Sequence, residues 1–210
     1  MSHSLTEQLA AAAAALVVDE GMEYGSAKRK AARQHHGRVE LPSNEQVEDA
    51  VREHIALFCA DTQARELQAL RAVALQWMRR LQAFRPHLSG AVWRGTATRL
   101  SDIHLDLYCD DSKAMEIALI NQGVDYESGI EPSSHPGHRG EPGNVLSLAE
   151  YCVELGEPVA LHLAVRDFED LRGALKPDAR GRSWRGDASA LRRLHDTLVP
   201  AGNGDPGATP

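Results

Sequence analysis

The sequence LSGAVWRGTATRLSDIHLDL, residues 88–107, carries the most specific pattern in the chain. Gly90 and Gly95 delimit a short segment, after which Ser101 and Asp102 open a run where apolar and polar residues alternate. Glycine permits a tight turn, and alternation with a period of two is typical of a strand with one buried face. The segment therefore predicts a glycine turn followed by a strand whose polar side chains share one face.

Short β-rich runs follow this segment and predict a small sheet. The expected strands are residues 103–109, 124–127, 145–155 and 159–165, with one helix at 112–122 that ends at Gly123. A Gly-Glu-Pro sequence at 156–158 predicts a hairpin turn between the last two strands. The sheet is therefore expected to be mixed or antiparallel. Proline and glycine residues between 129 and 143 predict a long mobile loop.

Helical patterns occupy the chain before residue 87. Ser4 and Ser43 are each followed three residues later by Glu or Gln, the signature of a capping box. The expected helices are residues 4–19, 26–36, 43–58 and 61–85, the last capped by Asp61 and stopped by Pro86. The sequence thus predicts an α+β fold with a helical region at 1–86 packed on a mixed sheet domain at 87–198. Residues 199–210 are expected to form a disordered tail.

The bulk properties exclude several functional classes. The 210 residues carry a net charge of −7, which opposes broad binding to nucleic acids or to anionic membranes. The three cysteines are far apart and form no CxxC pair, which favours a reducing compartment. No signal peptide or membrane span is indicated, because acidic residues flank the alanine-rich N-terminal run. We expect a soluble cytoplasmic protein with no membrane partner.

The segment 88–107 also resembles the signature motif of polymerase-β-type nucleotidyltransferases. That family has an apolar residue, glycine and serine, then a short helix with a further glycine, and then Ser-Asp-apolar-Asp on the next strand. The corresponding positions, matched without a gap, are Gly90, Ala91, Arg94, Gly95, Ser101, Asp102, Ile103 and His104. The resemblance implies a nucleotidyltransferase-like domain with a degenerate active-site motif.

The resemblance implies that this motif binds a nucleoside triphosphate with Mg²⁺ or Mn²⁺ and passes a nucleotidyl group to an unknown acceptor. Such transfer requires cations and backbone donors that offset the charge developing on the α-phosphate. The nucleotide-binding residues that it implies are Gly90, Ala91, Arg94, Gly95 and Ser101. Asp102 is the implied catalytic carboxylate, and Asp106 on the same strand face is expected to be the second.

The chain departs from the family pattern where the chemistry is most demanding. Ala91 lacks the hydroxyl that the family's serine offers to a phosphate, and His104 replaces an oxygen ligand for the cation. The later strand VALHLAV contains His162 but no acid. The resulting candidate metal cluster, suited to Mn²⁺, Zn²⁺ or Fe²⁺ rather than Mg²⁺, consists of Asp102, His104, Asp106 and His162.

Three functions remain open at this point. The first is metal-dependent nucleotidyl transfer. The second is a catalytically inactive nucleotidyltransferase-fold module that binds a nucleotide or a protein partner, and the third is a metal-binding protein. The two histidines are also consistent with ordinary hydrogen-bonded positions in a sheet. The sequence lacks the GxxxxGK[ST], GxSxG and HExxH motifs, which argues against P-loop ATPases, α/β-hydrolases and zincins.

Overall fold

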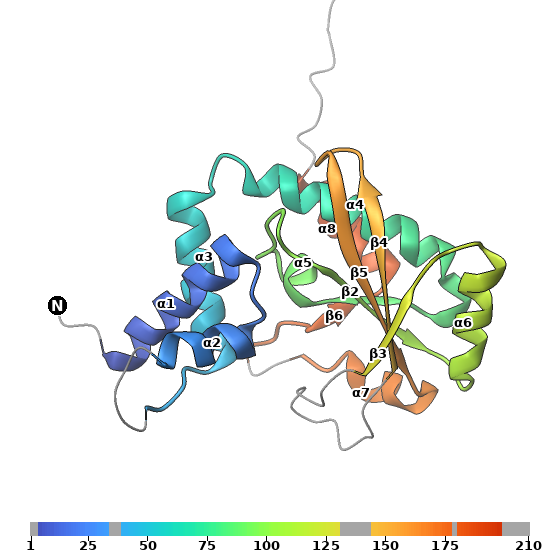
Figure 1. Ribbon diagram of the computed structural model, residues 1–210, viewed down its shortest axis with the longest axis horizontal. Coiled ribbons are helices and arrows are strands. Elements are labelled where there is room, and N and C mark those ends of the chain that lie inside the picture. Colours follow the sequence, from blue (N-terminus) through green and yellow to red (C-terminus); the bar gives the residue numbers. More distant parts are fainter. Residues whose placement is uncertain (1–3, 34–38, 131–143, 178–179, 199–210) are drawn as a thin grey trace, which may run out of the picture.

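The computed structural model describes residues 4–33, 39–130, 144–177 and 180–198 and has an α+β fold (Figure 1). Its helices are α1 (Leu5–Glu20), α2 (Tyr24–Ala32), α3 (Asn44–Phe58), α4 (Gln63–Arg80), α5 (Gly90–Arg94), α6 (Ser112–Asn121), α7 (Leu171–Ala174) and α8 (Ala188–Leu198). Its strands are β1 (His87–Ser89), β2 (Ile103–Tyr108), β3 (Glu127–Ile130), β4 (Asn144–Cys152), β5 (Glu157–Arg166) and β6 (Arg185–Gly186). The predicted loop beyond residue 130, the tail from 199 and the end of the second predicted helix lie outside the described residues.

The starts of the N-terminal helices follow their capping residues. Ser4 and Ser43 each accept a hydrogen bond from the backbone three residues later, and the side chain there returns one, so both predicted capping boxes are confirmed. The predicted cap at Asp61 is wrong, because Thr62 occupies the N-cap of α4. Helix α4 ends at Arg80, and a single 3₁₀ turn separates it from the segment that enters β1.

The strands form a mixed sheet in the order β3-β4-β5-β2-β1-β6. Strands β2 and β5 are parallel, and the other neighbours are antiparallel, which agrees with the predicted mixed sheet. The hairpin between β4 and β5 is present, but its turn occupies residues 153–156 rather than the predicted 156–158. Glu157 pairs with Cys152, so Glu157 and Pro158 belong to β5, and Gly156 ends the turn at a φ of 71°. Sequence periodicity missed β1 and β6 because they are too short to show it.

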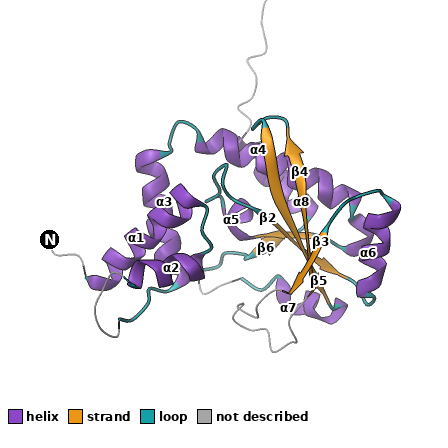
Figure 2. Cartoon of the chain, in the orientation of Figure 1, coloured by secondary structure: helices purple, strands orange, loops and turns teal. Residues whose placement is uncertain are grey.

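Two separate apolar cores stabilise the molecule. Helices α1 to α3, called the helical unit below, pack on one another around residues such as Leu9, Val47 and Val51. Helix α4 instead contributes Leu70 and Met78 to the core of the sheet, where it lies next to α8 (Figure 2). The division between the cores therefore falls between α3 and α4, before the boundary expected at residue 86. Among the described residues, none of the helices combines the length and apolar character needed to cross a membrane.

Gly186 provides a test of how β6 packs. A Cβ atom at this glycine would lie 2.0 Å from Cη2 of Trp93, so Gly186→Ala forces the indole out of its place. We expect the free energy of unfolding to fall by about 2 kcal/mol or more, the cost of overpacking. Urea denaturation followed by circular dichroism measures the change.

The matched control is Gly173→Ala in α7. A Cβ atom there meets nothing within 4 Å, and alanine favours the helical backbone. Stability is therefore expected to stay the same or to rise by about 0.5 kcal/mol. Equal losses in the two variants would show that β6 does not pack on Trp93 as described.

Candidate functional site

The alternation along β2 divides the sheet into an apolar and a polar face. Ile103, Leu105 and Leu107 lie in the sheet core, so the residues between them point to the opposite side. Strand β5 runs parallel to β2 and places its own alternating residues in register, with His162 opposite His104. The polar face, as used below, consists of Asp102, His104, Asp106, Ser147, His162 and Arg166.

The centre of the polar face is a chain of contacts through His162. The rings of His104 and His162 are stacked with their centroids 5.0 Å apart. His162 Nε2 lies 3.3 Å from Asp102 Oδ2, and His162 Nδ1 lies 2.8 Å from Ser147 Oγ. Both ring nitrogens of His162 therefore have partners, while the side chains of His162 and Asp102 remain partly exposed.

Glu23, at the start of α2, reaches across from the helical unit to His104. The distance from His104 Nε2 to Glu23 Oε1 is 3.5 Å. Burial opposes protonation of His104, but the hydrogen bond and charge of Glu23, together with the charges of Asp102 and Asp106, outweigh it and raise the pKa of His104. The hydrogen bond from His104 in turn lowers the pKa of Glu23. Sequence reasoning missed Glu23, since no motif connects it to β2.

Gly90 lies directly against this histidine. Its φ of 70° belongs to the left-handed region, and a Cβ atom added there would be 3.3 Å from Cδ2 of His104. Gly90 is therefore required both by the turn from β1 into α5 and by the close approach to the imidazole. The predicted glycine turn is confirmed, and it borders the polar face.

Asp106 is fully engaged by arginines. Its carboxylate lies 3.1 Å from Nε of Arg166 on β5 and 3.2 Å from Nη1 of Arg185 on β6. The Asp106 side chain is only 5% exposed, and Arg185 also donates a hydrogen bond to the hydroxyl of Tyr108. The carboxylate thus links β2 to β5 and β6, and both of its oxygens are already paired with guanidinium groups.

The donor set on the polar face does not fit the divalent cation that the family resemblance implies. Among the described residues, no group of three or more His, Cys, Asp or Glu side chains is arranged to hold a metal ion. Of the four predicted ligands, the structure brings Asp102, His104 and His162 together, but Asp106 faces two guanidinium groups. A metal ion at Asp106 would be repelled by the guanidinium groups of Arg166 and Arg185.

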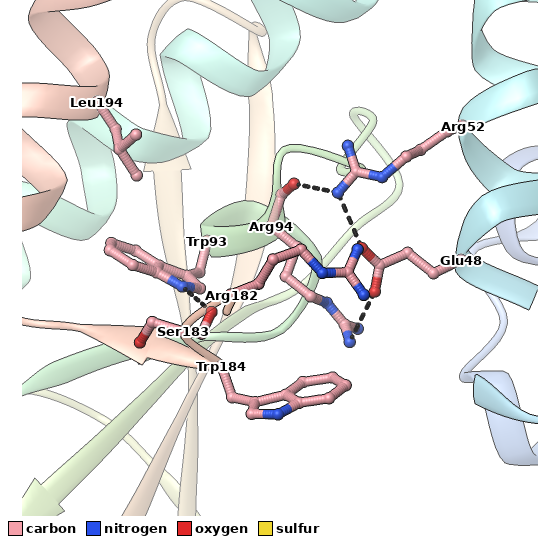
Figure 3. A pocket seen from close by; sticks show the side chains of 8 residues that line it. All are labelled: Glu48, Arg52, Trp93, Arg94, Arg182, Ser183, Trp184 and Leu194. Carbon is pink, nitrogen blue, oxygen red and sulfur yellow. Dashed lines mark hydrogen bonds and ion pairs between the residues drawn. The ribbon is translucent and has the colours of Figure 1, made fainter. Parts of the chain in front are cut away.

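The residues predicted to bind the nucleotide serve mostly local roles. The hydroxyl of Ser101 accepts a backbone N–H and closes the turn before β2, and Gly95 ends α5 at a φ of 80°. Ala91 packs against the sheet core. Arg94 forms an ion pair with buried Glu48 on α3 (Figure 3). Gly90 lies beside His104 of the polar face.

Comparison with known proteins identifies no family for this chain. The chain matches no protein-family model, and no curated protein is significantly similar to it.

The two aspartates of the polar face should differ sharply in their effect on stability. Asp106→Asn leaves two largely buried arginines without their counter-charge, so we expect the free energy of unfolding to fall by about 3 to 5 kcal/mol. Asp102→Asn removes only a half-exposed contact with His162 and should cost less than about 1 kcal/mol. Urea denaturation of both variants measures the difference; similar losses would contradict the structural role of Asp106.

The raised pKa of His104 depends on Glu23 and can be tested by titration. Glu23→Gln removes the partner charge, so the pKa of His104 should fall, as measured from its imidazole C–H signals by NMR. Stability from this pair is present below the unfolded histidine pKa of about 6.5 and is lost as pH rises through the folded pKa. Glu20→Gln is the control, because Glu20 pairs with Lys30 instead. An unchanged His104 pKa in Glu23→Gln would contradict the pairing.

Proposed function

We propose that the chain is a nucleotidyltransferase-like protein that binds a nucleoside triphosphate on the polar face and acts as a binding module rather than as a metal-dependent transferase. The observation that supports binding is the placement of His104 against both Gly90 and Glu23. The raised pKa of His104 favours an imidazolium, which is a charge-assisted donor to a phosphate oxygen. Because Gly90 has no Cβ atom, it places no side chain against the His104 ring.

The contacts of Asp102 and Asp106 support a protein that does not catalyse nucleotidyl transfer. Nucleotidyl transfer that uses one or two metal ions requires carboxylate oxygens that bind the same cation from one strand face. Asp106 is neutralised by Arg166 and Arg185, and Asp102 is hydrogen-bonded to His162. The polar face thus offers the imidazolium of His104 to an anionic oxygen but no matched pair of free carboxylates.

Binding is tested by titrating the protein with each of the four common ribonucleoside triphosphates, using calorimetry and NMR without a metal. We expect at least one to bind, and to bind more tightly at pH 6 than at pH 8, because the imidazolium of His104 is lost as pH rises through its pKa. His104→Asn should weaken that binding about tenfold, the value of one charge-assisted hydrogen bond.

His54→Asn is the matched control, since His54 lies on α3 and pairs with Asp19 away from the polar face. Its affinity for the nucleotide should equal that of the unchanged protein. If none of the four triphosphates binds, or if both histidine variants lose affinity equally, the polar face is not a nucleotide site.

Catalytic competence is tested separately with α-³²P-labelled triphosphates in Mg²⁺ or Mn²⁺. We expect no labelled product, whether or not a protein extract is added to supply possible acceptors. Turnover that disappears in Asp102→Asn would overturn the non-catalytic role and establish metal-dependent transfer, with Asp102 as its essential carboxylate.

A further inference from the structure

Ser147 on β4 lies directly opposite His162 on the polar face. The two strands pair with these residues in register, and Leu146 and Leu148 on either side of the serine point into the sheet core. The Ser147 side chain therefore points to the same side as the His162 ring, and its Oγ lies 2.8 Å from Nδ1 of that ring. Strand pairing thus fixes a hydroxyl against an imidazole nitrogen.

Asp102 determines which ring nitrogen of His162 carries the proton. A carboxylate only accepts hydrogen bonds, so the contact of 3.3 Å between Asp102 Oδ2 and His162 Nε2 places the ring proton on Nε2. Nδ1 of the neutral ring then has a lone pair to which the Ser147 hydroxyl donates. Hydroxyl, imidazole and carboxylate in this order are the groups with which an adjacent base activates a serine nucleophile. Either imidazole nitrogen can take up the proton.

A small molecule can reach these three side chains. His162 and Asp102 are 27% and 42% exposed, and Ser147 is half-buried. The neighbours of Ser147 and His162 on the same face of their strands are small apolar residues. By strand alternation they are Val145, Ala149, Ala160 and Ala164. The surroundings of the hydroxyl therefore suit a small apolar group.

Glu127 on β3 adds a charge beside the hydroxyl. It is the partner of Ser147 in the pairing of β3 with β4, and paired residues of neighbouring strands point to the same face. The exposed carboxylate of Glu127 therefore disfavours a ligand that carries its own negative charge next to Ser147. An uncharged acyl group fits these surroundings best.

We propose that Ser147 is the nucleophile of a site that hydrolyses small uncharged carboxylic esters, with His162 as its base. Oγ forms a bond to the acyl carbon and the bond to the leaving oxygen breaks, while the hydroxyl proton moves to Nδ1 of His162 and then to the leaving alcohol. Water next attacks the acyl-serine and gives a proton to the same nitrogen. The acid is released, and the proton returns to Ser147. The inference does not rest on nucleotide binding, because His104 takes no part in these proton transfers.

Covalent labelling of the unchanged protein tests the nucleophile directly. A fluorophosphonate probe forms a bond from phosphorus to an activated serine oxygen as the P–F bond breaks and fluoride leaves, and peptide mass spectrometry identifies the modified residue. We expect the label on Ser147 in the folded protein, and much slower labelling of Ser147 in protein unfolded with urea. This measurement requires no variant.

Ester turnover tests the complete reaction. The protein should release p-nitrophenolate from p-nitrophenyl acetate beyond the first equivalent, because water regenerates the serine. The negatively charged ester p-nitrophenyl hemisuccinate should react more slowly, since Glu127 repels it. Faster reaction with the hemisuccinate would contradict the preference for an uncharged acyl group.

Two substitutions assign the reaction to the serine and the histidine. Ser147→Ala should remove the label and the turnover, and His162→Asn should slow the labelling of Ser147 about 100-fold, as expected for loss of a general base. Ser26→Ala is the matched control, because the Ser26 hydroxyl on α2 accepts a hydrogen bond from Arg29. Its rates should equal those of the unchanged protein, and circular dichroism checks that each variant is folded.

Asp102 acts through His162 as a positioning residue, and the position of the ring proton tests this role. The ¹⁵N shifts of the His162 ring should show the proton on Nε2 in the unchanged protein. In Asp102→Asn the amide can donate to Nε2, so the proton should move to Nδ1 and labelling of Ser147 should slow about tenfold. Asp102→Glu should restore both in part. An unchanged ring proton in Asp102→Asn would remove the positioning role.

Three results would overturn the proposal. The first is the absence of label from Ser147 in the folded protein, or equal labelling after unfolding. The second is equally fast labelling of Ser147 in folded His162→Asn. The third is undiminished ester turnover in Ser147→Ala, which would show that other surface groups consume the ester. In each case the contacts of Ser147 and Asp102 with His162 serve only to hold neighbouring strands together.

Discussion

The alternation of side chains along β2 is the constraint on which both the fold and the polar face depend. A shift of one residue in its pairing with β5 would expose the apolar set and bury the charged set. The apolar face of β2 is covered by α4 and the rest of the sheet core, so the register is fixed by burial. Because β5 is parallel and in register, the same constraint stacks His162 on His104 and brings both histidines to Asp102.

The pair of arginines around Asp106 decides what the polar face can do. By strand alternation alone, Asp106 lies on the same face as Asp102 and could supply the carboxylate that His104 replaces. Arg166 and Arg185 change this, since they arrive from β5 and β6 and satisfy the second carboxylate inside the sheet. A buried carboxylate with two guanidinium partners links β2 to β5 and β6, whereas a free carboxylate would favour a divalent cation. Strand spacing alone therefore does not define the chemistry of a site.

The sequence predicted the parts of the structure that depend on neighbouring residues. Both capping boxes, the glycine turn at Gly90, the alternating strand β2 and the helix α6 were all visible as local patterns. The contacts of Glu23 with His104 and of Arg185 with Asp106 were not, because they join segments that only the tertiary fold brings together. The packing of α4 on the sheet was not visible either, because the apolar stripe of an amphipathic helix does not show which apolar surface it will cover.

The helical unit contributes two carboxylates to contacts with the sheet domain, Glu23 to His104 and Glu48 to Arg94. Its apolar core is separate from that of the sheet, so these ionic contacts, with the hydrogen bond from Arg52 to the carbonyl of Arg94, are a large part of what orients it. On the polar face, Glu23 would repel an anion that His104 attracts, so the net free energy of binding would be reduced. A ligand that makes additional contacts, such as several phosphate oxygens, would thus be favoured over a simple inorganic anion.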